Sequence, residues 1–254
     1  MHLPARLMGR AALGALRLAV IALALLSVSV ATRPPPLMSP VLWAWERAED
    51  LRFVDPGVTI AILAGTIRLT RTGVQAQPRL QPALLRPAQP VIGVVHLETE
   101  GHPAWTRAMR EKTAALTLAL LKNPRFTAVQ IDFEVKASDR VVLLDLLADV
   151  RAGLAGRPLS MTALASWCDT ETWIDAAPVD EIVPMLFRMG SAGEPIRQRL
   201  ANGGDFRQKR CRTAIGVATD KPPDAIPAGR SVWMFNPRPW TADDLRAIRE
   251  RLGT

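Results

Sequence analysis

The chain has 254 residues, of which 48% are hydrophobic and 22% are charged. This length is ample for a single hydrophobic core, and the composition excludes a disordered protein or a disulfide scaffold. The formal net charge is +8, but the basic residues beyond the N-terminal segment are scattered along the chain. Nucleic-acid binding needs a basic stripe with interleaved aromatic residues, so we expect no nucleic-acid partner.

Residues 1–31 predict a signal peptide. Met1 to Arg17 is basic, and Leu18 to Val30 is an uninterrupted run of apolar or small residues with the length of a signal-peptide core. A proline-rich linker over residues 32–40 follows. The alternative is an uncleaved membrane anchor, because residues 11–31 could just span a bilayer. Either reading puts the domain outside the cytoplasm, in the periplasm or held at the inner membrane through this segment alone.

Eight short segments rich in β-branched and apolar residues follow, and the stretches between them are long enough for crossover connections. This order predicts parallel strands in one α/β domain, a (β/α)8 TIM-type barrel over residues 41–254. The expected strands are Val41–Glu46, Val58–Ile67, Val91–Glu98, Ala128–Val135, Leu159–Trp167, Glu181–Arg188, Arg212–Thr219 and Ser231–Asn236.

Helices are expected in several of the connections, since apolar residues recur there at helical spacing and capping residues stand at the ends. The barrel should nevertheless be irregular, because a Thr72-Gly73 turn predicts a β-hairpin after the second strand. The connection before the last strand is also poor in helix signals. Long helices are predicted at Trp105–Leu121, Ser138–Leu154 and Thr241–Leu252, and short ones at Ala48–Phe53, Thr172–Ala176 and Pro195–Leu200.

The two cysteines, Cys168 and Cys211, lack the spacing of metal ligands. One follows the C-terminal end of a predicted strand and the other precedes the start of another, which places them at opposite ends of the barrel. We therefore expect free thiols, with a disulfide as the alternative if a loop folds back.

The segment Ala128–Val135 carries the strongest chemical signal. Gln130, Asp132 and Glu134 alternate with apolar residues, so all three polar side chains share one face of the strand. In a barrel this face points inward and rises towards the C-terminal mouth, where active sites of such barrels lie. A carboxyl group whose pKa is raised there can act as a general acid at neutral pH. The alternative is a structural network in which arginines pair with Asp132 and Glu134.

VQIDFEV resembles the fourth strand of chitinase-type (family eighteen) glycoside hydrolases, which ends in Asp-x-Glu. Residues 179–188 (VDEIVPMLFR) are similar to the sixth strand of that family, and Trp233 lies on the last strand, where the family places a sugar-binding tryptophan. The resemblance implies that Glu134 is the general acid. It also implies that Asp132 orients the acetamido group of the substrate, which acts as the nucleophile.

Three positions depart from the chitinase pattern. Gln130 replaces the first acid of the series, Phe187 replaces a tyrosine that helps to hold the substrate, and Arg188 replaces an aspartate. We therefore do not expect the chitinase reaction itself. Nearly the whole chain after the leader resembles the exported bacterial family called domain of unknown function 3142, through WAWERAEDLRFVDP, LAGTIRL, ALASWCDTETW and VPMLFRMG. That resemblance implies export but no particular activity.

Other polar and aromatic residues fall at the ends of predicted strands and are candidates for the same mouth. The tryptophans among them could stack on sugar rings, although aromatic residues at such positions also fill barrels. His96 and Glu98 share a strand face, and a structural hydrogen bond between them is the competing explanation. The candidate binding residues are Gln130, Trp45, Glu46, His96, Glu98, Trp167, Met185, Arg188, Trp233 and Asn236.

These observations predict an exported barrel of glycoside-hydrolase type that acts on or binds a glycan of the envelope or the extracellular space. The competing hypothesis is a non-catalytic barrel that binds a glycan or a protein in the envelope. The sequence contains no phosphate-binding loop, dinucleotide fingerprint, nucleophile elbow or zinc motif. We therefore expect neither a cofactor nor a metal.

Overall fold

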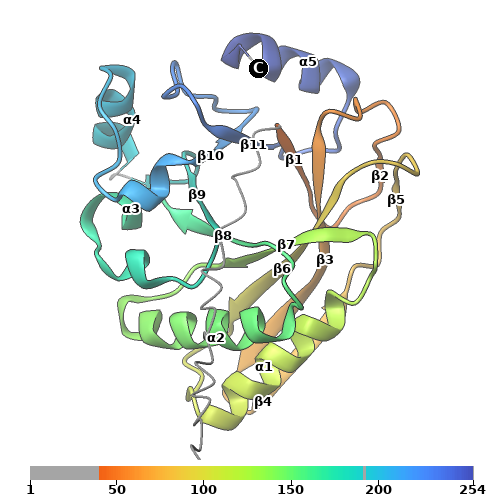
Figure 1. The fold of residues 1–254 in the computed structure, drawn as a ribbon, viewed down its shortest axis with the longest axis vertical. Helices are drawn as coiled ribbons and strands as arrows, with labels where there is room; N and C mark the ends of the chain where they lie inside the picture. Colours follow the sequence, from red (N-terminus) through yellow and green to blue (C-terminus); the bar gives the residue numbers. More distant parts are fainter. Residues whose placement is uncertain (1–39, 191–192, 254) are drawn as a thin grey trace, which may run out of the picture. The chain divides into compact units, whose positions relative to one another are not determined.

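A computed structural model describes residues 40–190 and 193–253 of the chain. The predicted leader and nearly all of the proline-rich linker lie outside the described residues. The described residues belong to one compact unit. Its architecture is a closed barrel of eight parallel strands with helices around it, as the spacing of the apolar segments predicts (Figure 1).

The barrel closes because the first and second of its strands pair with each other and the first also pairs with the last. β1 runs parallel to both β3 and β11, and every other neighbouring pair in the ring is parallel as well. All eight predicted strands are confirmed, although most end a few residues earlier than expected. In the order of the chain they are β1 (Val41–Ala44), β3 (Thr59–Thr70), β6 (Val91–Thr99), β7 (Phe126–Phe133), β8 (Leu159–Leu164), β9 (Glu181–Met185), β10 (Ala214–Ala218) and β11 (Ser231–Phe235).

Side chains alternate between two hydrophobic layers along each strand, because successive residues of a strand face opposite sides. In β1, Val41 and Trp43 belong to the cluster that fills the barrel, whereas Leu42 and Ala44 pack in the outer cluster beneath the helices. In β7, the apolar residues Val129, Ile131 and Phe133 pack outward. The polar residues of this strand therefore face the interior.

The helical layer is uneven. α1 (Arg107–Leu120) and α2 (Arg140–Gly153) pack side by side after β6 and β7 (Figure 1). α5 (Ala242–Leu252) follows the last strand, and its N-cap Thr241 accepts a hydrogen bond from the backbone N–H of Asp244, as expected. The remaining helical segments are α3 (Trp167–Thr170), α4 (Gly193–Ala201) and 3₁₀ turns at Ala137–Asp139, Trp173–Ala176 and Lys209–Arg212.

The predicted hairpin is present. β3 continues beyond the barrel and pairs antiparallel with β4 (Gly73–Pro78), with Thr70 opposite Gly73. The two-residue turn is therefore Arg71-Thr72, one position earlier than expected. α1 packs against this extension as well as against α2, so the hairpin takes the place of a crossover helix.

Two local predictions are wrong. Ala48–Phe53 is not a helix, since it contains β2 (Glu49–Asp50), which pairs with β5 (Ala83–Leu84). The buried Glu49 carboxylate accepts hydrogen bonds from the Arg47 side chain and the backbone N–H of Trp240, which stabilises this extended path. Ser138 does not cap α2, because it lies inside the 3₁₀ turn that precedes the helix.

The expectation of free thiols is also wrong, because Cys168 and Cys211 form a disulfide with a Cα–Cα distance of 5.8 Å. β8 ends at Leu164 rather than Trp167, and the chain turns at once into α3 along the outside of the barrel. The 3₁₀ turn that carries Cys211 lies against this helix, where the N–H of Gln208 donates to the carbonyl of Cys168. Both sulfurs are fully buried in the outer hydrophobic layer.

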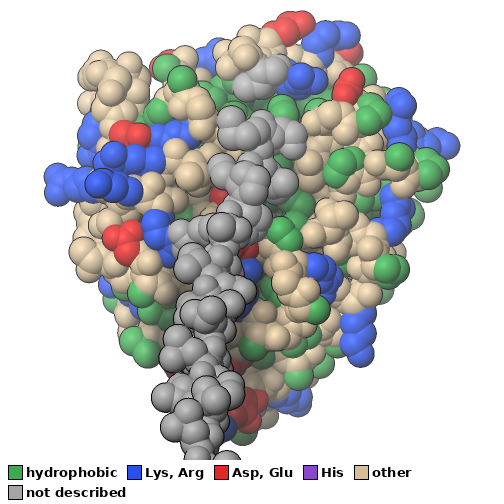
Figure 2. Space-filling model, in the orientation of Figure 1, with side chains coloured by type: hydrophobic (Ala, Val, Ile, Leu, Met, Phe, Trp, Pro, Cys, Tyr) green, Lys and Arg blue, Asp and Glu red, His purple; other side chains and the backbone are tan. Residues whose placement is uncertain are grey.

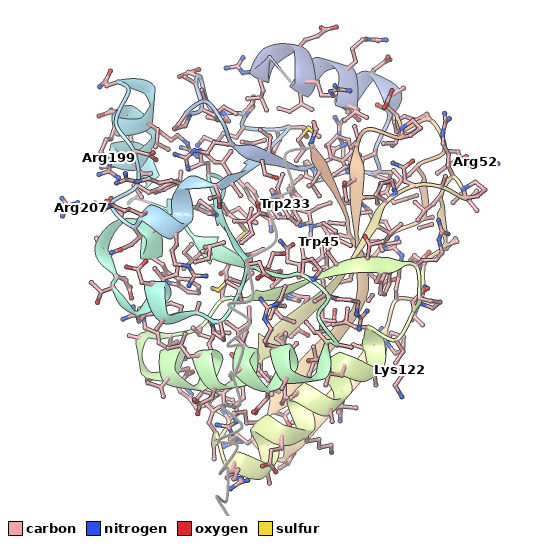
Figure 3. The ribbon with its side chains drawn as sticks, in the orientation of Figure 1. Trp45, Arg52, Lys122, Arg199, Arg207 and Trp233 are labelled. Carbon is pink, nitrogen blue, oxygen red and sulfur yellow. A yellow bond between two sulfur atoms is a disulfide. The ribbon has the colours of Figure 1, made fainter. Side chains whose placement is uncertain are left out.

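Within the described part of the chain, no helix combines the length and the apolar character needed to cross a membrane. On the face drawn in Figure 2, Lys and Arg side chains occur in several separate places and alternate with acidic ones. The largest basic group on that face lies near Arg199 and Arg207, at the edge of the molecule in Figure 3. Arg199 is paired there with Asp169 at 2.6 Å.

Candidate functional site

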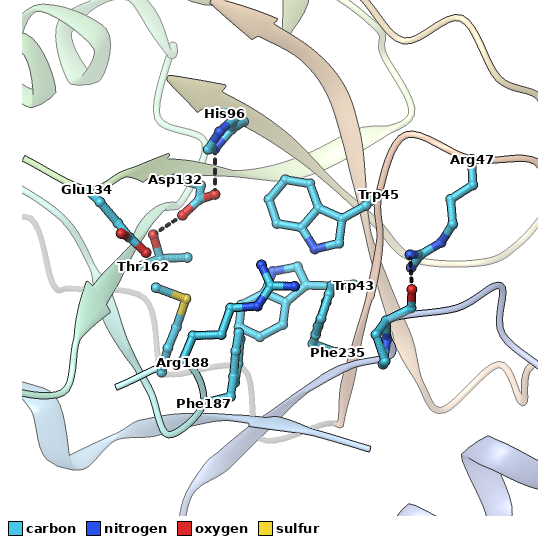
Figure 4. A pocket seen from close by; sticks show the side chains of 12 residues that line it. Trp43, Trp45, Arg47, His96, Asp132, Glu134, Thr162, Phe187, Arg188 and Phe235 are labelled. Atoms are coloured by element: carbon cyan, nitrogen blue, oxygen red, sulfur yellow. Dashed lines mark hydrogen bonds and ion pairs between the residues drawn. The ribbon is translucent and has the colours of Figure 1, made fainter. Parts of the chain in front are cut away.

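A cavity of about 310 Å³ opens at the C-terminal ends of the barrel strands. Six of its lining residues come from the ends of β1, β6, β7 and β9 and were candidates on sequence grounds. The walls combine aromatic rings with two acids, one histidine and two arginines (Figure 4). The lining residues are Trp43, Trp45, Arg47, His96, Asp132, Glu134, Thr162, Met185, Phe187, Arg188, Phe235 and Pro237.

Asp132 is held on both of its carboxylate oxygens. Its Oδ2 lies 2.7 Å from Nδ1 of His96, and its Oδ1 accepts a hydrogen bond of 2.5 Å from the Thr162 hydroxyl. His96 and Asp132 are opposite each other on the paired strands β6 and β7, so the register of the barrel creates this contact. The Asp132 side chain is almost fully buried, and the three residues form a fixed network (Figure 4).

The pKa of His96 is raised within this network. Burial alone would lower it, but the hydrogen bond to Asp132 and the charges of Asp132, Glu98 and Glu134 outweigh the burial. The protonated form of His96 is therefore favoured beside the acids, relative to a free imidazole. An imidazolium–carboxylate pair at the wall of a cavity can stabilise charge that develops on a bound molecule.

Glu134 lies at the rim of the cavity, one residue beyond the end of β7. Unlike Asp132, it has no hydrogen-bond or ion-pair partner among the described residues. Its pKa is raised, first because protein atoms partly desolvate the carboxyl group and second because Asp132 is nearby; His96 and Arg188 act in the opposite direction. The side chain remains exposed, so solvent moderates all of these effects. Glu134 thus has the properties of an acid that can reach a ligand.

The floor of the cavity is aromatic. Phe187 and Phe235 stack with ring centroids 5.3 Å apart, and Trp43 meets Phe187 edge-on at 6.2 Å. The indole N–H of Trp43 donates to Oε1 of Gln130 at 2.7 Å, which fixes the ring from below. The Trp43 ring has room here because β10, which β11 separates from β1, carries Gly216, where a Cβ would come within 2.9 Å of the indole.

Arg188 and Arg47 lie on the side of the cavity away from the acids. The Arg188 guanidinium is 5.5 Å above the ring of Phe235, and its backbone adopts a left-handed φ of 55°. Arg47 is used differently, because it pairs with Glu49 and donates to the backbone carbonyls of Asn236 and Pro237. Arg188 is therefore available to a ligand, whereas Arg47 holds the connection after β11 in place.

The structure brings six of the predicted site residues together in the lining of the cavity and places the other six elsewhere. Glu46 accepts hydrogen bonds from backbone N–H groups of the loop after β4, and Glu98 pairs with Arg68 on the surface. Trp167 packs against Trp173 in the outer layer. Buried beneath or beside the cavity lie Gln130, Trp233 and Asn236.

Trp233 does not form a sugar platform in this arrangement. It is fully buried, with its ring 5.3 Å from that of Trp43, which covers it. Trp43 rather than Trp233 lines the cavity, although the Trp43 side chain is itself buried. Figure 3 shows Trp233 and Trp45 near the centre of the molecule, far from the labelled basic residues at its edges.

Several lining residues were missed by the sequence reasoning, and two had a usable signal. Trp43 shares a strand face with Trp45, and Thr162 shares one with Ser160 in the polar alternation of β8. The alternation of side chains that places Asp132 and Glu134 on the inner face of β7 also predicts an inward position for Trp43 and Thr162. Arg47 and Pro237 lie in connections without periodicity, so their positions follow only from the closure of the barrel.

Compared with models of protein families and with curated proteins, the chain matches none. The two family resemblances remain predictions, and the function is argued from the cavity itself. Among residues 40–190 and 193–253, no group of three or more His, Cys, Asp or Glu side chains is placed to hold a metal ion.

Proposed function

We propose that the protein is a glycoside-hydrolase-type barrel that cleaves a glycan, with Glu134 as the general acid. The observation that carries this proposal is the contrast between the two acids. Asp132 is fixed by His96 and Thr162, whereas Glu134 is unpaired, has a raised pKa and lines the same cavity as the aromatic floor. Glycosidases use such a pair, one carboxyl group protonated and one ionised.

The aromatic floor suits a sugar ring, because CH groups of a pyranose pack well on flat aromatic surfaces. The volume of about 310 Å³ is at the small end of ligand pockets, which fits one ring buried and its neighbours outside. In this arrangement Glu134 donates its proton to the leaving glycosidic oxygen as the C–O bond breaks. Water then adds to the anomeric carbon and returns a proton to the Glu134 carboxylate. The Asp132 carboxylate faces the positive charge that develops at the anomeric carbon.

Export is the second part of the proposal. Disulfides persist in oxidising compartments and are rare in the cytoplasm, and Cys168–Cys211 is fully buried in the outer layer of the barrel. This supports the expectation from the leader that the barrel works in the periplasm or at the outer side of the inner membrane. A glycan of the envelope or of the surroundings would then be its substrate.

A non-catalytic glycan-binding barrel is the second candidate, and one observation favours it. Both oxygens of Asp132 are engaged, so this side chain cannot rotate towards a substrate without breaking the bonds to His96 or Thr162. A binding protein needs no such rotation. The same cavity would then hold a sugar without turnover.

Replacing Glu134 with glutamine separates the two candidates. The side chain is exposed and unpaired, so the Glu134→Gln variant should keep the melting temperature of the wild type. Against a panel of envelope and extracellular oligosaccharides, we expect wild-type hydrolysis to fall by at least about 100-fold in the variant, the usual contribution of a general acid.

The pH dependence provides a further check. The activity should fall as pH rises through the pKa of Glu134, because only the protonated acid can donate. Exposed Glu250→Gln on α5 is the matched control and should change nothing. Glycan binding without turnover in both wild type and Glu134→Gln would establish the binding barrel instead.

A further inference from the structure

The cavity has two sides of opposite charge. His96, Asp132 and Glu134 stand at the ends of β6 and β7, and Arg188 stands at the end of β9. In Figure 4, the Arg188 side chain extends over the aromatic floor towards Trp45 rather than away from the barrel. A cation in this position faces whatever occupies the cavity.

Arg188 differs from Arg47, the other arginine of the cavity, in having no polar partner among the described residues. Arg47 is paired with Glu49 and bound to two carbonyl groups. Arg188 has no hydrogen-bond or ion-pair partner among the described residues, and its one contact of note is the ring of Phe235. Two carboxylates lie across the same cavity, yet neither has paired with it.

The backbone at Arg188 adds a second, independent observation. Its φ of 55° lies in the left-handed region, which disfavours residues other than glycine, asparagine and aspartate. Such a conformation costs on the order of 1 kcal/mol or more and is concentrated at functional sites. Here the turn directs the side chain across the cavity.

We infer that Arg188 binds a single negative charge on the ligand, so that the preferred glycan is acidic, with a carboxylate or a sulfate ester on the sugar next to the cleaved bond. This inference rests on the proposed function. The planar guanidinium matches such a group with two parallel hydrogen bonds. Stacking on Phe235 orients the guanidinium without using its N–H groups.

The arrangement of charge favours one anion in one orientation. The Asp132 carboxylate, together with Glu134 whenever Glu134 is ionised, repels a negative group from this side of the cavity, so the acidic substituent must point towards Arg188 after β9. A phosphate monoester, with nearly two charges at neutral pH, would be only half neutralised by one guanidinium. The cavity thus selects both the charge of the sugar and its direction.

Binding of the anion would also prepare the acid. In the free protein Arg188 lowers the pKa of Glu134, which opposes the effects of burial and of Asp132. An anion paired with Arg188 cancels much of this field, so Glu134 keeps its proton to a higher pH in the complex. The alkaline limb of kcat should therefore lie at higher pH than that of kcat/KM.

The test compares matched oligosaccharides that differ only in charge. The probes are a galacturonate tetramer and a hyaluronan tetrasaccharide, each with its methyl ester, and a κ-carrageenan tetrasaccharide with its desulfated form. Binding to the Glu134→Gln protein is measured by calorimetry at low salt. At least one acidic probe should bind ten-fold or more tightly than its neutral counterpart, and the pair that does so separates carboxylate from sulfate.

Three further substitutions, each added to the Glu134→Gln protein, test whether Arg188 causes the preference for the acidic probe. Arg188→Gln should remove it while leaving the melting temperature unchanged, and Arg188→Lys should keep part of it. Arg207→Gln, an exposed arginine at the edge of the molecule, should leave it intact (Figure 3). The inference would be overturned by any of three results. These are equal binding of the acidic and neutral members of every pair, no binding of any of the six probes, or a preference for the acidic probe that persists in Arg188→Gln.

The result is independent of catalysis. If acidic probes bind preferentially through Arg188 but the wild type hydrolyses none of them, the inference of an acidic ligand stands and the proposed hydrolase function is rejected. If instead neutral glycans are hydrolysed, and this activity is lost in Glu134→Gln but unaffected by Arg188→Gln, the hydrolase function stands and the acidic ligand is rejected.

Discussion

At the scale of single residues, the barrel gives chemically similar side chains very different properties. Glu134 is exposed and unpaired, Asp132 is fixed by two hydrogen bonds, and Glu181 is buried at the start of β9. Neither oxygen of Glu181 has a hydrogen-bond partner of normal geometry among the described residues, although the Trp233 indole lies close enough to affect its pKa. Sequence alternation predicted that Asp132 and Glu134 face inward, but not which of them is free.

Glu181 should make the stability of the protein fall as pH rises. Burial raises its pKa to about 8, and the Trp233 indole lowers it less than burial raises it. The folded protein therefore holds a proton that the unfolded chain loses above its usual value of 4.5. Between these values each pH unit costs up to about 1.4 kcal/mol of unfolding free energy, and the effect is complete above the folded pKa.

Glu181→Gln removes this titration. Relative to wild type, the variant should gain up to about 5 kcal/mol at pH 9 and nothing near pH 4. Urea denaturation at several pH values measures the difference. An equal pH dependence in wild type and Glu181→Gln would show that the buried carboxyl group does not titrate as described.

At the scale of elements, one strand shapes the cavity through a residue that has no side chain. β10 lies beside β11 and β9, and its Gly216 leaves the space in which the Trp43 ring lies. The ring in turn covers Trp233 and forms part of the floor. The sequence identified β10 as a strand, but a glycine within a strand does not reveal which ring it accommodates.

Gly216→Ala should damage both stability and binding. The new methyl group would lie 2.9 Å from Cη2 of Trp43, so the ring has to move and its hydrogen bond to Gln130 is strained. We expect a loss of about 1–3 kcal/mol in unfolding free energy, typical of overpacked cores, together with weaker glycan binding.

The matched control is Gly73→Ala at the start of β4, where an added Cβ meets no atom within 4 Å. It should change the unfolding free energy by less than about 0.5 kcal/mol. If the two glycine variants behaved alike, Trp43 would not depend on Gly216 for its position.

At the scale of the whole molecule, the disulfide joins segments that follow different strands. Cys168 and Cys211 are separated by 43 residues, and the enclosed chain includes β9 and α4. Ordinary barrel topology predicts opposite ends for the two cysteines. They meet because α3 turns back along the barrel wall, a path that strand patterns do not specify.

Removal of this bond should be costly. The disulfide closes this loop in the unfolded chain and so lowers the entropy of the unfolded state. In the chain-entropy model this contributes about 4 kcal/mol to the free energy of unfolding. The Cys168→Ala/Cys211→Ala double variant, and the wild type under reducing conditions, should both unfold at a lower urea concentration than the oxidised wild type. An unchanged midpoint after verified reduction would contradict this expectation.

The eight strands, the hairpin and the inward face of β7 were predictable from local sequence patterns, because strand periodicity and turn chemistry are local properties. The sequence also brought six of the site residues to one mouth, since the C-terminal ends of parallel strands meet there. Local patterns could not predict the disulfide, the burial of Trp233 beside Trp43 or the unpaired guanidinium of Arg188. These features depend on the paths of the connecting loops and on which side chain fills a given space in the barrel. Both are set by packing between residues that are far apart in the chain.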